Sequence, residues 1–133
     1  MAGAKVLDSW ALLAHLERGR GYEKIIELFE RAVESSRPLL MCIVNWGEVY
    51  SQVVRRFGEQ KAQEIEKLIQ TLPIALIEAD KDLTRKAARV KATKRIAYGD
   101  CFAVALARLK KAELYTGDSE FKAVEKDIKV VWL

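Results

Sequence analysis

The sequence predicts an α/β fold of three layers, α/β/α, in which a parallel sheet of about five strands lies between helices. Short apolar segments of strand length alternate with longer segments whose apolar residues recur at helical spacing. This alternation is typical of parallel strands joined by crossover helices. The chain has 133 residues, enough for a sizeable core, so we expect residues 1–133 to form a single domain.

The chain opens with a short strand at Val6 and Leu7, and Asp8 follows it directly. Asp8 and Ser9 are both candidate caps of the next helix, because each side chain can accept a hydrogen bond from a backbone N–H group of the first turn. Two helices are predicted here, over residues 10–18 and 22–35.

A second strand is predicted over residues 39–44, because this run is apolar throughout and suits a strand buried on both faces. Asn45 would then cap a helix that ends near residue 57, with Glu48 in its first turn. At about 100° per residue, Glu48 falls nearly opposite the apolar stripe of this helix. The helix resumes after Gly58, over residues 59–71.

The second half of the chain continues the alternation. Its predicted elements are a strand at 74–77, helices at 80–93 and 100–111, a strand at 114–116, a short helix at 120–126 and a last strand at 128–133. The helix that Asp100 opens is almost wholly apolar, which predicts burial on all sides. Taken alone, Asp100 could be no more than a helix cap, since helix N-termini favour carboxylates.

Four acids occupy comparable positions in this pattern. Asp8 and Asp118 each follow a predicted strand, Glu48 lies just after another, and Asp100 opens the central helix. The carboxyl ends of parallel strands line one edge of a sheet, which is where ligands bind in open α/β folds. We therefore expect these side chains to converge into one acidic pocket.

An acidic pocket of this kind requires a cation. Two carboxylates about 5 Å apart repel by roughly 3 kcal/mol at an effective dielectric constant near 20. One or two Mg²⁺ or Mn²⁺ ions would remove this repulsion, activate a water molecule and offset charge on a phosphodiester transition state. We expect the following roles: principal metal ligands, Asp8 and Asp100; completion of the shell, directly or through water, Glu48 and Asp118; orientation of a ligand or of the scissile phosphate, Ser9 and Thr116.

The composition narrows the class of metal and of protein. There are one histidine and two cysteines, Cys42 and Cys101, both in apolar surroundings. A zinc site of the usual Cys/His type is therefore excluded, and oxygen ligands select a hard cation. The cysteines are typical of reduced, buried residues of a cytoplasmic protein. No apolar run approaches the roughly 20 residues of a membrane span, and we expect no secretory signal.

The net charge of +4 permits a polyanionic partner without requiring one. Cations cluster on the helix predicted over residues 80–93, and the candidate nucleic-acid contacts among them are Arg85, Lys86, Arg89 and Lys91. Such a cluster is either a solvated helix face or a surface that follows phosphates beside the acidic pocket. The sequence leaves both interpretations open.

With the acids placed, the chain resembles the PIN domain family over nearly its whole length, and most closely its VapC-type ribonuclease toxins. The resemblance rests on four motifs in order: Val6-Leu7-Asp8-Ser9, Asn45-Trp46-Gly47-Glu48-Val49, Tyr98-Gly99-Asp100 and Thr116-Gly117-Asp118-Ser119-Glu120-Phe121. None of these motifs is specific alone; their order and spacing carry the resemblance.

The resemblance implies a PIN-like fold and a metal-dependent RNA endonuclease that leaves 5′-phosphate and 3′-hydroxyl ends. It also implies the toxin of a type II toxin–antitoxin pair, with an antitoxin protein that covers or fills the active-site groove. A homodimer or a higher homo-oligomer is the implied assembly. The RNA target, the antitoxin and the number of metal ions do not follow from the sequence.

Three other kinds of function compete with the nuclease. A receiver-like signalling module has the same size and an acidic Mg²⁺ pocket, but it needs paired acids after the first strand, where this chain has only Asp8. A phosphotransferase of the haloacid type needs Asp-x-Asp there, and Asp8-Ser9-Trp10 does not match. A PIN scaffold that binds RNA without cleaving it would lack divalent-metal binding, which separates it from the nuclease.

Overall fold

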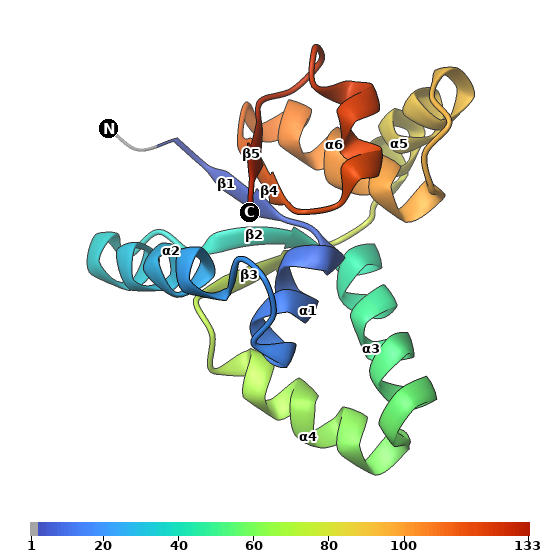
Figure 1. Cartoon of the computed structure of the whole chain (residues 1–133). Coiled ribbons are helices and arrows are strands. Elements are labelled where there is room, and N and C mark those ends of the chain that lie inside the picture. The colour runs from blue at the N-terminus through green and yellow to red at the C-terminus, as the bar shows by residue number, and fades with distance from the viewer. Residues whose placement is uncertain (1–2) are drawn as a thin grey trace.

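A computed structural model describes residues 3–133 and contains one sheet of five parallel strands (Figure 1). The strands are β1 (Lys5–Leu7), β2 (Leu39–Cys42), β3 (Ile74–Ile77), β4 (Glu113–Thr116) and β5 (Val130–Trp132). They lie in the order β3-β2-β1-β4-β5, and every neighbouring pair is parallel. The predicted parallel sheet of about five strands is confirmed.

Helices cover both faces of this sheet. They are α1 (Ser9–Glu17), α2 (Tyr22–Ser35), α3 (Ile43–Phe57), α4 (Glu59–Gln70), α5 (Lys81–Thr93), α6 (Tyr98–Lys110) and the 3₁₀ helix η1 (Ser119–Val124). Figure 1 shows α1 to α4 on one side of the sheet and α5 and α6 on the other, which is the predicted three-layer arrangement. Within residues 3–133, no helix is both long and apolar enough to cross a membrane.

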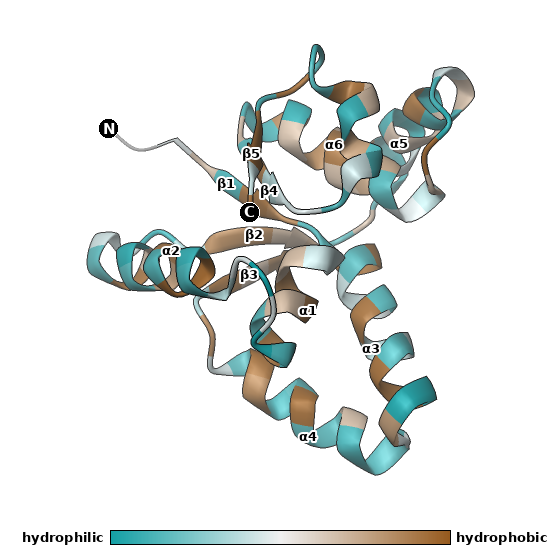
Figure 2. Cartoon of the chain, viewed as in Figure 1, coloured by the Kyte–Doolittle hydropathy of each residue, from teal (hydrophilic) through white to brown (hydrophobic). Residues whose placement is uncertain are grey.

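Alternate strand residues point into two separate cores, as the period of two in a β-strand requires. On β1, Val6 packs with α5 and α6, whereas Leu7 packs with α1 to α4. On β4, Leu114 packs in the core formed with α5 and α6, and Tyr115 packs in the core formed with α1 to α4. Strands β2 and β5 are accordingly brown, the colour of hydrophobic residues, in Figure 2.

The central helix α6 is buried along most of its length, as its apolar composition predicts. Eight consecutive residues, from Asp100 to Ala107, are buried, and α5 packs along this helix. Leu106 is fully buried, while Leu109, one turn later, is 44% exposed. The first turn of α6 is therefore held rigidly at the edge of the sheet where the acids were expected.

Several predicted boundaries were wrong, and two of them concern residues near the acids. The strand predicted over residues 39–44 ends at Cys42, and α3 begins at Ile43. Asn45 is consequently inside the first turn of α3 and does not cap it. The apolar pair Ile43 and Val44 fits a strand or a buried helix turn equally well, so the sequence could not fix this boundary.

The second boundary concerns Asp100. Helix α6 begins two residues earlier than predicted, at Tyr98, and its cap is Ala97, which makes no side-chain cap hydrogen bond. The carboxylate of Asp100 is thus not a helix cap. Asp8 does cap α1, through a hydrogen bond from the Ala11 N–H group, so of the two candidate caps the structure selects Asp8 over Ser9.

At the end of the chain, the helix predicted over residues 120–126 is a 3₁₀ helix at 119–124, and the last strand covers only 130–132. The strand order also excludes the receiver-like alternative, since that doubly wound fold has the order 2-1-3-4-5.

We predict a large difference between two leucines of α6. Leu106→Ala should lower the free energy of unfolding by about 2–5 kcal/mol, because it leaves a cavity beside the sheet. Leu109→Ala is the matched control and should cost less than about 1 kcal/mol, because the side chain is nearly half exposed. Urea denaturation of both variants would measure this. Equal losses would show that α6 is not buried as described.

Candidate active site

The candidate site lies where the strand order reverses, between β1 and β4. The chain passes from β1 outward to β3 on one side and from β4 to β5 on the other. Leu7, the last residue of β1, pairs with Tyr115 of β4, so Asp8 and Thr116 follow at the same edge of the sheet. A crevice at such a reversal is the usual ligand-binding position in open α/β sheets.

Asp8 is buried, and each of its carboxylate oxygens accepts one hydrogen bond. Its side chain is 1% exposed; one carboxylate oxygen accepts the Ala11 N–H at 2.9 Å and the other accepts the Thr116 hydroxyl at 2.5 Å. Burial raises the pKa of Asp8 from 3.8 to about 7, and the negative charge of Asp118 adds to this, while both hydrogen bonds lower the pKa. Asp8 is therefore oriented rigidly but carries its charge at a cost.

Thr116 connects two of the acids. Its hydroxyl donates to Asp8 and accepts a hydrogen bond of 3.0 Å from the backbone N–H of Asp118. The Thr116 side chain is fully buried, so these bonds have no competition from solvent. One hydroxyl group thus fixes the ends of β1 and β4 relative to each other.

Asp100 joins this group from the first turn of α6. Its side chain is 6% exposed, and burial raises its pKa to about 7. The acids Asp118, Glu120, Asp8 and Glu48 also raise this pKa, in decreasing order of effect. The structure therefore brings the four acids predicted from the sequence within electrostatic reach of one another, together with a fifth, Glu120.

Glu48 is held against the start of α6 by Asn45. The Asn45 amide donates to a Glu48 carboxylate oxygen at 2.9 Å and to the Gly99 carbonyl at 3.0 Å. A Cβ atom at Gly99 would collide with the Glu48 carboxylate, so the close approach requires glycine at that position. Asn45 is fully buried and ties the first turns of α3 and α6 together. Sequence reasoning gave Asn45 only the role of a cap.

Glu120 is the acid that sequence reasoning missed as a site residue. One carboxylate oxygen from each of Asp100, Asp118 and Glu120 lies within 4.8 Å of the others. Asp118 caps η1 by accepting the Glu120 N–H at 3.0 Å. The available signal was the Asp-x-Glu spacing after β4, which becomes meaningful only once a tight 3₁₀ turn follows Asp118.

These three acids fit a divalent cation. They offer oxygen atoms only, the ligands that Mg²⁺ and Mn²⁺ prefer. Ser9, the remaining predicted site residue, is the first residue of α1 and is half-buried; within residues 3–133 its hydroxyl makes no hydrogen bond.

The cations of α5 have partners near their own helix. Lys86 and Arg85 pair with Asp82, with N–O distances of 2.6 and 3.5 Å. Lys91 donates to the Ile96 carbonyl at 2.8 Å, and Arg89 is exposed. Burial raises the pKa of Cys101, the neighbour of Asp100, and the charge of Lys91 lowers it, which places Lys91 on the α6 side of this helix.

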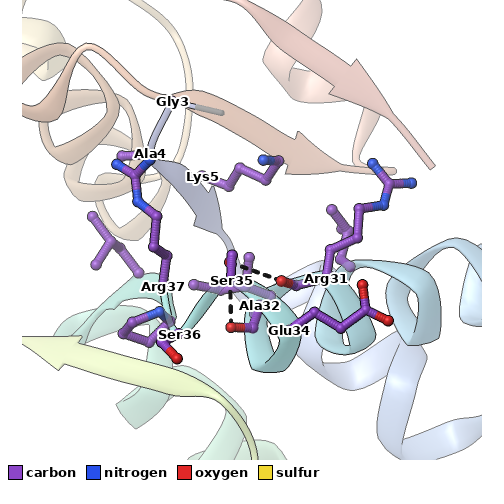
Figure 3. A pocket seen from close by; sticks show the side chains of 13 residues that line it. Gly3, Ala4, Lys5, Arg31, Ala32, Glu34, Ser35, Ser36 and Arg37 are labelled. Carbon is purple, nitrogen blue, oxygen red and sulfur yellow. Dashed lines mark hydrogen bonds between the residues drawn. The ribbon is translucent and has the colours of Figure 1, made fainter. Parts of the chain in front are cut away.

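A cavity of about 650 Å³ lies at the opposite edge of the sheet. It is lined by the amino ends of β1 and β2 and the last turns of α2, and Figure 3 shows Lys5, Arg31 and Arg37 around it. Because it adjoins the amino ends of the strands, it is separate from the acids. It contributes nothing to the candidate site.

The raised pKa values predict how the metal-free protein responds to pH. Asp100 binds a proton more tightly in the folded state, so the free energy of unfolding should fall as pH rises from about 4 to about 7. Asp100→Asn removes this effect. We expect the variant to melt close to wild type near about pH 4 and at a higher temperature above about pH 7. The corresponding gain in the free energy of unfolding should be on the order of a few kcal/mol.

The matched control is Asp82→Asn, because Lys86 lowers the pKa of Asp82 and the charge is favourable there. This variant should gain no stability as pH rises. Adding Mn²⁺ at neutral pH should raise the Tm of wild type through linkage and leave Asp100→Asn nearly unchanged. Thermal melts in chelator and in Mn²⁺ would measure both effects. A variant that melts below wild type at every pH would mean that Asp100 experiences no repulsion.

Comparison with solved structures shows the same fold in toxin proteins. VapC20 of Mycobacterium tuberculosis, described as a toxin that cleaves the sarcin-ricin loop, is 16% identical, with a TM-score of 0.68 over 91% of this chain and 95% of that one. VapBC2 of Rickettsia felis, solved on a promoter DNA fragment, is 13% identical with a TM-score of 0.76 and 98% coverage of both chains. A toxin–antitoxin complex from Klebsiella pneumoniae is 20% identical, with a TM-score of 0.64 and 96% coverage of both chains.

At these identities the structures establish the fold alone. No curated protein matches the sequence closely enough to count as a relative. A family model does match: the model of the PIN domain covers residues 5–127, which includes both central strands and all five acids. The chain therefore belongs to the PIN domain family.

Proposed function

We propose that this chain is a divalent-metal-dependent RNA endonuclease and the toxin of a type II toxin–antitoxin pair. The observation that carries the proposal is the convergence of Asp100, Asp118 and Glu120, with Asp8 and Glu48 beside them, at the reversal of strand order. Such a concentration of acids repels a phosphodiester unless a cation is bound. Membership of the PIN family and the fold shared with VapC20, a toxin described as cleaving RNA of the sarcin-ricin loop, support the same conclusion.

Asp100, Asp118 and Glu120 would hold a Mg²⁺ or Mn²⁺ ion, since their oxygens lie closest together. Asp8 and Glu48 would complete the shell, directly or through water. Each Asp8 oxygen already accepts one hydrogen bond, but a carboxylate oxygen retains a second lone pair. When bound, the ion supplies positive charge beside the scissile phosphate and a water molecule of lowered pKa.

The protein's own contribution is rigid positioning. Thr116 holds Asp8 and the backbone of Asp118 in a fixed relation, and Asn45 holds Glu48 against α6. Because the carboxylates of Asp8 and Glu48 are fixed before any ligand arrives, little ordering of these two groups remains to be done on binding. Ser9, half-buried beside Asp8, would contribute its free hydroxyl to the orientation of the phosphate.

An antitoxin is the proposed protein partner, and a homodimer or higher homo-oligomer in the cytoplasm is the proposed assembly. Support comes from the neighbours, since the Rickettsia and Klebsiella structures are toxin–antitoxin assemblies. Co-expression with the product of an adjacent small reading frame tests this. The proposed antitoxin should co-purify with the chain and abolish its RNA cleavage.

We predict that Asp100→Asn and Asp8→Asn each abolish Mg²⁺- or Mn²⁺-dependent cleavage of single-stranded RNA while the fold survives. The reason is loss of negative charge at the cation, which should lower the rate by at least on the order of a hundredfold. Asp82→Asn, the same change on the exposed face of α5, is the control and should cleave like wild type. The assay follows labelled RNA by gel, and circular dichroism checks the fold. Wild-type activity in either site variant would show that the site is assigned wrongly.

A second prediction concerns α5. If Arg85, Lys86, Arg89 and Lys91 follow the RNA backbone, changing them to glutamine should weaken RNA binding. The log–log salt slope should fall by roughly 0.7 for each phosphate that the protein no longer neutralises. Metal affinity should not change, because these side chains are outside the acid cluster. Binding titrations at several salt concentrations would measure the slope. If it stays unchanged, this helix face is only a solvated surface.

A further inference from the structure

Next to the acids lies an arginine, Arg20, to which no role has been assigned so far. Arg20, in the loop between α1 and α2, places its guanidinium over the ring of Trp10, 5.5 Å from the ring centroid. The same guanidinium donates a hydrogen bond of 3.4 Å to the carbonyl of Gly117. Two independent contacts therefore hold the end of an exposed arginine.

The ring of Trp10 packs against Gly117, next to the acids. A Cβ atom at Gly117 would collide with three atoms of the Trp10 ring, so the indole lies directly on the backbone of that glycine. Gly117 stands between Thr116, which binds Asp8, and Asp118, which belongs to the acid triad. The guanidinium of Arg20 is thus held at Gly117, the residue just before Asp118, on the rim of the candidate site.

No acid of the described residues forms an ion pair with Arg20. In the part of the chain that the structure describes, it forms no ion pair, and its only hydrogen-bond partner is the Gly117 carbonyl. A cation that lies beside an acidic site without neutralising it remains available to an anionic ligand.

Further cations lie next to Arg20. A cavity of about 420 Å³ adjoins Arg20 and is also lined by the cations Arg18 and Lys24, by one acid, Glu23, and by Leu133. Lys24 donates to the carbonyl of Trp132, at the end of β5. The cations here lie on one loop and the first turn of α2, at the same edge of the sheet as the acids.

We propose that Arg20, held on Trp10, binds a backbone phosphate of single-stranded RNA adjacent to the phosphate that is cleaved. The inference rests on the proposed nuclease function and adds to it the path of the strand on one side of the site. A guanidinium presents a planar fork of donors that matches two phosphate oxygens. Its stacking on Trp10 fixes that fork in advance, which reduces the ordering cost of binding.

The experiment compares Arg20→Ala and Arg20→Lys with Arg31→Ala. Arg31 is a matched control, because it is an exposed arginine of α2 that pairs with Glu27 and lines the cavity at the opposite edge of the sheet. Wild type is first tested for Mn²⁺-dependent cleavage of a labelled single-stranded RNA. Binding of the same RNA is then titrated on the Asp100→Asn background, between about 50 and 200 mM salt.

Arg20→Ala should weaken binding by on the order of tenfold and lower the log–log salt slope by about 0.7. Arg20→Lys should keep the slope and lose part of the affinity, because an ammonium keeps the charge without the planar fork. Arg31→Ala should stay within about twofold of its background. With Asp100 restored, the Mn²⁺ concentration that gives half of the maximal rise in Tm should be the same in wild type and in the three arginine variants.

The inference is overturned if Arg20→Ala and Arg31→Ala give the same affinity and the same salt slope while wild type cleaves RNA. A lower Tm of Arg20→Ala with unchanged RNA binding would also overturn it, because the contact with Gly117 would then only brace the loop. If wild type neither cleaves nor binds RNA, the proposed function fails, and this inference fails with it. The cleavage assay therefore separates the two failures.

Discussion

The hydrogen bond between the Thr116 hydroxyl and Asp8 is the contact on which the site depends. It joins the two central strands at the point where the strand order reverses, and both partners are buried. The carboxylate of Asp8 also starts α1, and the Thr116 hydroxyl also receives the N–H of Asp118. Burial of Asp8 raises the pKa of its carboxyl group, and the same two hydrogen bonds that hold the carboxylate in place counteract this rise.

The positions of four acids could be predicted from the sequence, because a parallel sheet brings every strand end to one edge. Glu120 could not, because its placement depends on the 3₁₀ turn that Asp118 caps. The hydrogen bonds of Asn45 to Glu48 and Gly99 could not be predicted for a similar reason. Only a helix that starts at Ile43 turns this side chain toward Glu48 and Gly99, and Ile43 and Val44 suit a strand as well as a helix.

Close backbone approach shapes both sides of the site. Gly99 gives room to the Glu48 carboxylate, and Gly117 gives room to the Trp10 ring. The first glycine brings an acid toward the cluster, and the second brings an aromatic ring that supports a cation beside it. Negative charge at the centre and positive charge at the rim thus depend on the same feature, two glycines against which a neighbouring side chain packs more closely than a Cβ atom would allow.

The acids are spread over most of the chain, from Asp8 near the start to Glu120 near the end. During synthesis the N-terminal carboxylates leave the ribosome well before Asp118 and Glu120, and β5 can pair with β4 only after both have emerged. The acid triad cannot assemble before Asp118 and Glu120 have emerged. A shorter nascent chain therefore holds only part of the acid cluster, so the ligand set proposed for the cation is incomplete until this late stage of synthesis.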